Sequence, residues 1–138
     1  MTARFTARTK ARKRALDLLF AGEARGTSAV ELLDEAVAAG DEPTNPYTPT
    51  VVRGVVAEQE RIDALISTYS QDWSIERMPA VDRNVLRIAV WEMLYADDIP
   101  AGVAVSEAVA LVTELSTDES PQFVNGLLAA IERHDTTA

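Results

Sequence analysis

The chain has 138 residues, enough to bury a single core, and it has no cysteine, which excludes disulfides, thiolate metal sites and a cysteine nucleophile. No apolar run approaches the roughly 20 residues of a membrane span, so we expect one domain over residues 1–138, located in the cytoplasm and with no membrane contact. The formal net charge is -9, yet six of the 13 basic residues lie among the first 14 residues and all 22 acidic residues follow them.

The first predicted helix runs from about Thr6 to Ala24. Basic side chains project from all sides of its first turns. Burying these cations without partners would be costly, so we expect the first two turns to project beyond the core. Cations at a helix N-terminus also oppose the helix dipole. An external anion such as nucleic acid explains the segment better than local stability does, with a solvated terminus as the alternative. The basic residues are Arg4, Arg8, Lys10, Arg12, Lys13 and Arg14.

The middle of the chain divides into a short helix, a loop and a long helix. Ser28 and Glu31 have the spacing of a capping box, which predicts a second helix that ends near Gly40. Three prolines between residues 41 and 49 indicate a loop. Thr48 and Pro49 then suit the N-cap and first position of a long third helix that stops before Trp73.

Three further helices complete a predicted all-α chain. The fourth, Val81–Ala96, is apolar almost all round, which is typical of a central, buried helix. A fifth helix is expected over Val103–Leu115, and a sixth from Ser120 to about Arg133. Because no long linker separates these six elements, we expect one bundle-like domain.

Three charged residues of the fourth helix need an explanation. Arg83 and Arg87 share one face, either as a solvent-facing strip or as an extension of the basic surface. Glu92 lies on an apolar side of the helix, where a carboxylate must be paired internally or belong to an interface.

The sixth helix contains an unusual glycine. Phe123, Val124, Leu127 and Leu128 recur with helical spacing around Gly126, so a helix is favoured over a hairpin. A glycine inside a helix costs about 1 kcal/mol relative to alanine, which close helix packing or close approach of a ligand backbone would offset. Core packing explains most of the apolar residues, while Phe123 and Asn125 could offer a stacking face and an amide to a base.

No arrangement of side chains suggests catalysis. The one histidine, His134, lies five residues from the end of the sequence, and no nucleotide-binding, metalloprotease or serine-hydrolase motif is present. Pairs of acidic residues such as Asp97 and Asp98 are adjacent in sequence, so they do not face one another as a catalytic dyad would. We therefore expect no enzymatic activity, no metal site and no cofactor.

Four motifs follow one another along nearly the whole chain: Arg8-x-Lys10-Ala11-Arg12-x-x-Ala15-Leu16-x-Leu18-Leu19-Phe20, Val81-Asp82-Arg83-x-x-Leu86-Arg87-Ile88-Ala89-x-x-Glu92-Met93, Ser106-Glu107-Ala108-Val109 and Phe123-Val124-Asn125-Gly126. Their order and spacing resemble those of the NusB family of transcription antitermination factors. The resemblance implies an all-α fold of six to seven helices arranged as two small packed bundles. It also implies binding of the boxA element of ribosomal RNA leader transcripts, together with NusE, a ribosomal protein, in an antitermination complex on RNA polymerase.

The resemblance also implies roles for individual residues. Arg8, Lys10, Arg12 and Lys13 would contact RNA, Arg87 would extend the same surface, and Phe123 and Asn125 match the last motif. Phe20 stands where the family often has tyrosine, so it can stack on a base but cannot donate a hydrogen bond. Glu92 maps to the surface that meets NusE.

The chemistry of these residues suits single-stranded RNA, which is bound by a basic track together with groups that stack on bases. Neutralising about five phosphates predicts a log-log salt slope near -3.5. The alternative hypothesis is a helical protein–protein adapter whose charged helix docks on an acidic partner, with RNA binding incidental. The apolar helices would also allow a homodimer.

Overall fold

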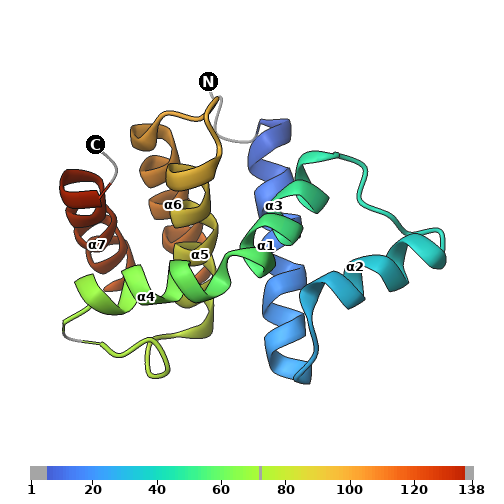
Figure 1. Cartoon of the computed structure of the whole chain (residues 1–138), viewed down its shortest axis with the longest axis horizontal. Coiled ribbons are helices and arrows are strands. Elements are labelled where there is room, and N and C mark those ends of the chain that lie inside the picture. The colour runs from blue at the N-terminus through green and yellow to red at the C-terminus, as the bar shows by residue number, and fades with distance from the viewer. Residues whose placement is uncertain (1–5, 72, 136–138) are drawn as a thin grey trace. The chain divides into compact units, whose positions relative to one another are not determined.

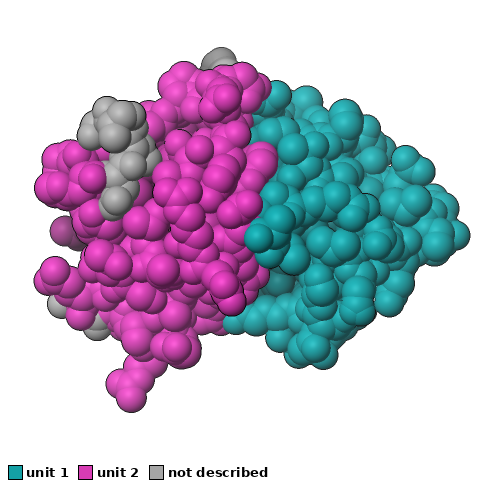
Figure 2. Space-filling view, in the orientation of Figure 1, with its two compact units in different colours: residues 1–57 teal, residues 58–138 magenta. Residues whose placement is uncertain are grey.

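The computed structural model describes residues 6–71 and 73–135, and these residues form seven α-helices and no strand (Figure 1). This confirms the all-α prediction. They fall into two compact units, Met1–Ala57 and Glu58–Ala138, which Figure 2 colours separately. In the part of the chain that the structure describes, no helix has the length and apolar character needed to cross a membrane.

The first unit contains α1 (Ala7–Arg25), α2 (Ala29–Ala38) and α3 (Tyr47–Ala57), and each packs against the other two. Two polar side chains cap its helices, and the cap at Ser28 is the predicted one. Thr6 accepts a hydrogen bond from the Thr9 amide at the start of α1, and Ser28 accepts one from the Val30 amide at the start of α2. α1 ends at Gly26, whose φ of 70° is the left-handed conformation that glycine adopts without strain.

The second unit contains α4 (Gln59–Tyr69), α5 (Ala80–Tyr95), α6 (Ala101–Leu115) and α7 (Ser120–Asp135). As predicted, α5 is central in this unit, since it packs against α4, α6 and α7. At its start the buried Asp82 carboxylate accepts a hydrogen bond of 2.8 Å from the buried Ser120 hydroxyl, which ties the first turn of α5 to the first residue of α7.

The predicted long third helix is wrong, because the chain leaves helical geometry at Glu58 (φ -112°, ψ 18°) and forms α3 and α4 instead. The buried side chains explain the break. Val51, Val52 and Val55 of α3 are buried within a helix of the first unit, whereas Ile62 and Ile66 of α4 belong to the second. Apolar periodicity continues through both segments, so it does not reveal the change of unit.

Candidate nucleic-acid interface

The start of α1 is fastened to the start of α3 by hydrogen bonds. The Asn45 side chain accepts from the Tyr47 amide at 2.8 Å and donates to the Ala7 carbonyl at 3.3 Å. One turn further along α1, the Thr48 hydroxyl donates to the Ala11 carbonyl at 2.9 Å, and the Thr48 side chain is buried. The prediction that the first two turns of α1 project beyond the core is therefore wrong.

Tyr47 accounts for much of this difference. The Arg8 guanidinium lies over its ring, 4.4 Å from the ring centre, and the Arg12 guanidinium lies 5.8 Å from the same centre. An aromatic face attracts a cation, and the attraction is stronger where water is excluded. Arg8 is exposed, but Arg12 is buried, and a buried cation without a partner would be costly. Tyr47 gives Arg12 an aromatic partner from the segment that the sequence predicts to be a loop.

Arg12 is only 3 % exposed. It was predicted to contact RNA, but in this structure its guanidinium is covered and lies beside Tyr47. The buried geometry suits a residue that holds α1 in place better than one that meets a phosphate.

Three other predicted RNA-binding residues share a different face of α1. At about 100° per residue, Lys10, Lys13 and Phe20 fall within about 80° of one another, Arg8 falls on the opposite side of the helix, and Arg12 lies between Arg8 and Phe20. Lys10 is exposed, Lys13 is half-buried and the Phe20 ring is 43 % exposed. This face therefore combines two lysines with an accessible aromatic ring, as an RNA-binding surface requires, and it also carries the exposed Asp17.

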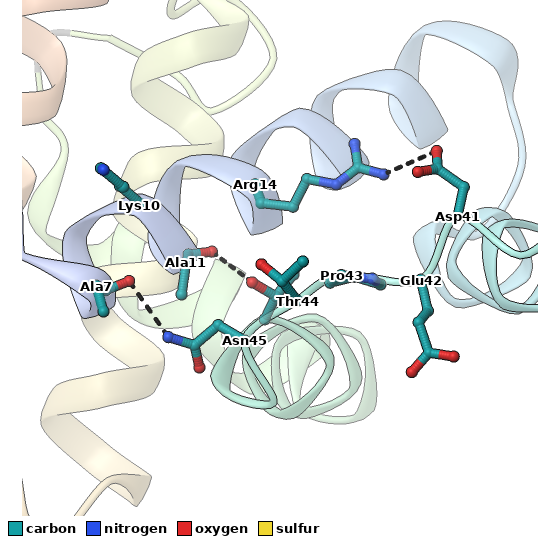
Figure 3. A pocket seen from close by; sticks show the side chains of 10 residues that line it. Ala7, Lys10, Ala11, Arg14, Asp41, Glu42, Pro43, Thr44 and Asn45 are labelled. Carbon is teal, nitrogen blue, oxygen red and sulfur yellow. Dashed lines mark hydrogen bonds and ion pairs between the residues drawn. The ribbon is translucent and has the colours of Figure 1, made fainter.

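A pocket of about 420 Å³ lies next to Lys10, between α1 and the loop that joins α2 to α3 (Figure 3). Its walls come from Ala7, Lys10, Ala11 and Arg14 of α1, from Thr48 of α3, and from residues 41–45 of the loop. Arg14 points toward Asp41, with 3.9 Å between Nη2 and the carboxylate oxygen. The pocket has the size of a small-ligand site.

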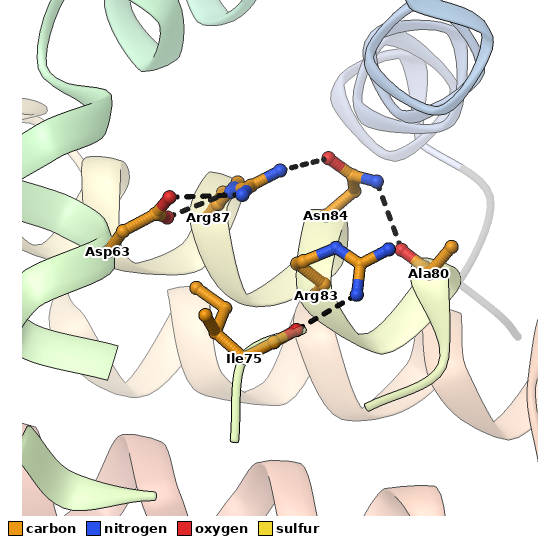
Figure 4. Close-up of polar contacts among 6 residues, drawn as sticks. All are labelled: Asp63, Ile75, Ala80, Arg83, Asn84 and Arg87. Atoms are coloured by element: carbon orange, nitrogen blue, oxygen red, sulfur yellow. Dashed lines mark hydrogen bonds and ion pairs between the residues drawn. The ribbon is translucent and has the colours of Figure 1, made fainter. Parts of the chain in front are cut away.

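Arg87 forms an ion pair within the second unit (Figure 4). Its Nε and Nη2 atoms donate to the two carboxylate oxygens of Asp63 at 2.9 and 3.0 Å, and Nη1 donates to the Asn84 side chain at 3.2 Å. The Arg87 side chain is 11 % exposed. Arg83 donates to the backbone carbonyls of Ile75 and Met78. The solvent-facing strip is therefore wrong, because both arginines make structural contacts, and Arg87 does not offer a ready extension of the basic surface.

Glu92 is 1 % exposed. The resemblance placed it on a surface that meets a partner protein, but its side chain is buried in this structure. Burial follows from its position on the apolar side of α5: viewed down the helix axis, Glu92 lies between the directions of the buried residues Val85 and Ile88.

The last motif lies on α7 with mixed exposure. Phe123 is half-buried and meets Trp73 edge to face, with 4.9 Å between ring centres, whereas Asn125 is exposed. Gly126 is also exposed, and a Cβ atom built there would meet nothing within 4 Å. Close packing within the described chain therefore does not explain this glycine, which leaves open the predicted approach of a ligand backbone.

Sequence reasoning missed Asn45 and Tyr47 and misassigned Thr48. The three prolines indicate a loop there, and Thr48 and Pro49 suit an N-cap and a first helical position, whereas α3 begins two residues earlier at Tyr47 and Asn45 caps it. The contacts of Asn45 and Thr48 with α1 span 38 and 37 residues, so no local pattern could predict them.

Comparisons with known proteins agree along the chain. The family model described as "NusB family" matches residues 9–133. The chain is 67 % identical over 129 residues to a transcription antitermination protein NusB from Nocardioides sp., covering 94 % of this chain and 96 % of that protein. The solved NusB of T. maritima superposes with a TM-score of 0.83 at 33 % identity, covering 95 % of this chain and 94 % of that one.

A solved complex of the antitermination factors NusB and NusE with double-stranded RNA contains a chain that superposes with a TM-score of 0.78 at 30 % identity. The match covers 91 % of this chain and 96 % of that one. A family match over almost the whole length, joined to the same all-α fold, settles the relationship. The chain belongs to the NusB family.

Proposed function

We propose that this protein is a transcription antitermination factor that binds boxA RNA of ribosomal RNA leader transcripts together with NusE and joins the antitermination complex on RNA polymerase. The observation that carries the proposal is the face of α1 that combines Lys10, Lys13 and the exposed Phe20 ring on an otherwise acidic chain. A related NusB has been solved with NusE and RNA, which supports both partners.

In this proposal the basic residues of α1 have different roles. Lys10 and Lys13 meet phosphates, and Phe20 stacks on a base. Arg8 is exposed and contributes charge from the edge that faces Tyr47. Arg12 does not contact RNA directly but holds α1 against Tyr47, since it is 3 % exposed. Phe123 and Asn125 of α7 offer a second, less charged contact.

The alternative is an adapter whose charged helix docks on an acidic partner. Two features of the fourth predicted helix would also suit an adapter, but Arg83 and Arg87 are held by internal hydrogen bonds and Glu92 is buried, so only the charged helix still supports it. The RNA-binding proposal depends on neither feature.

The test is a fluorescence anisotropy titration of labelled boxA RNA, a scrambled single strand and a double-stranded RNA, with and without NusE, at several salt concentrations. We expect preference for boxA, tighter binding with NusE, and a log-log salt slope of about -2, because Lys10, Lys13 and Arg8 can neutralise about three phosphates while Arg12 is buried and Arg87 is paired with Asp63. Replacing both Lys10 and Lys13 by alanine should reduce the magnitude of the slope by about 1.4. Equal, weak binding to all RNAs in every condition would instead favour the adapter.

A further inference from the structure

The pocket between α1 and residues 41–45 has no assigned role, and its walls differ in chemistry from one end to the other. Lys10 lies at one end, with its side chain extending away from the loop, and Arg14, Asp41 and Glu42 lie toward the other end (Figure 3). Between them, Ala7 and Pro43 present small apolar surfaces, with the buried Ala11 behind them. A ligand that fits this order has an anionic group, a flat apolar body and an edge that forms hydrogen bonds.

Lys10 is the residue of the pocket that can bind an anionic group. Its side chain is exposed and makes no ion pair or hydrogen bond with any residue in the ranges 6–71 and 73–135. Arg14 differs, because Asp41 lies 3.9 Å from it, and their side chains are 39 % and 85 % exposed. An exposed pair at this distance is weak, so both groups can turn to a ligand.

The backbone around the pocket is already held in place. Asn45 joins the loop to the Ala7 carbonyl, and Thr48 joins α3 to the Ala11 carbonyl. Both hydrogen bonds connect opposite walls of the pocket, so its width does not depend on a ligand. A preformed site loses less entropy when a ligand binds.

We propose that this pocket holds one unpaired nucleotide of the bound RNA. The phosphate meets Lys10, the base lies over Ala7, Ala11 and Pro43, and the base edge meets the Thr44 hydroxyl and the Arg14–Asp41 pair. Single-stranded RNA is recognised through bases that leave the stack in this way. The inference rests on the proposed RNA-binding function and adds a specificity site to it, on the side of Lys10 away from Phe20.

The test fills the pocket without changing charge. Ala7 is exposed in the first turn of α1 and lines the pocket, so Ala7→Leu adds bulk there while the backbone contact with Asn45 is kept. Ala24→Leu is the matched control, because it makes the same change at an exposed alanine in the last turn of α1. Urea denaturation of both variants checks that each remains folded.

We expect Ala7→Leu to weaken boxA binding about five- to tenfold, the lower part of the range for one stacked base, and to leave the salt slope unchanged. Ala24→Leu should bind as the wild type does. A series of boxA RNAs, each carrying 2-aminopurine at a different position, then locates the bound nucleotide. At one position, the fluorescence should change when the wild-type protein is added and should not change when Ala7→Leu is added.

Two results would overturn the pocket assignment but not the RNA-binding function. In the first, Ala7→Leu binds boxA RNA as tightly as the wild type does, while Lys10→Ala binds it more weakly. In the second, Ala7→Leu binds NusE more weakly but binds RNA normally. If the wild type itself showed no preference for boxA with or without NusE, the proposed function would fail first, and this inference with it.

Discussion

The stacking of Arg8 on Tyr47 can be measured directly. Tyr47→Leu removes the aromatic face but keeps an apolar side chain at the first position of α3, and Arg8→Ala removes the cation. Tyr47→Phe is the control, since it keeps the ring. The double-mutant cycle of Arg8→Ala and Tyr47→Leu isolates the energy that couples these two side chains.

The geometry sets the expected size of that coupling. Arg8 is exposed and 4.4 Å from the ring centre, and an exposed cation–π contact contributes about 0.5 to 1 kcal/mol. Arg12 is buried at 5.8 Å from the same centre, where desolvation raises the contribution to as much as about 2 kcal/mol. Tyr47→Leu should therefore lower the free energy of unfolding by about 1 to 3 kcal/mol, with about 0.5 to 1 kcal/mol coupled to Arg8.

Urea denaturation followed by circular dichroism supplies the four free energies of the cycle. Tyr47→Phe should retain most of the coupling with Arg8→Ala. A coupling within about 0.3 kcal/mol of zero, the usual level of additivity for independent sites, would show that Tyr47 does not hold Arg8. The start of α1 would then be held by Asn45, by Thr48 and by the buried Arg12, without a contribution from Arg8.

The remaining predictions also concern stability in urea. Gly126→Ala should raise the free energy of unfolding by about 1 kcal/mol, because Gly126 is exposed within α7 and its Cβ would meet nothing within 4 Å. Gly22→Ala should lower it, since the new Cβ would lie 2.8 Å from the Thr27 carbonyl oxygen; equal effects of the two changes would contradict this reasoning. Asp63→Asn should lower the free energy of unfolding by about 1 to 3 kcal/mol, between the values for exposed and fully buried ion pairs. An unchanged value would mean that the pair with Arg87 has no structural role.

Local sequence signals predicted most helices well. The observed bounds of α1 and α5 lie within one residue of the predicted ones, and Thr6 and Ser28 form side-chain caps. These features depend on apolar periodicity and on hydrogen bonds between residues two or three positions apart, so they can be recognised from the order of residues.

The candidate site was predictable only in part. The sequence located the basic residues, because charge can be counted, whereas a stacking role for Phe20 was implied only by the family resemblance. It could not tell that Arg12 is buried, because that depends on Tyr47, which lies 35 residues further along the chain. Nor could it show that Asp63 holds Arg87 across 24 residues.

By itself, then, the sequence determined most of the helices, the cap at Ser28 and the excess of positive charge at the start of α1, since these follow from neighbours along the chain. The tertiary structure decided which cations are available to RNA and which support the fold. It divided the predicted long helix at Glu58 and built the pocket beside Lys10 from α1 and a loop about 30 residues away in sequence. The physical reason is common to these features: a charged side chain or a wall of a pocket takes its role from what lies against it in space.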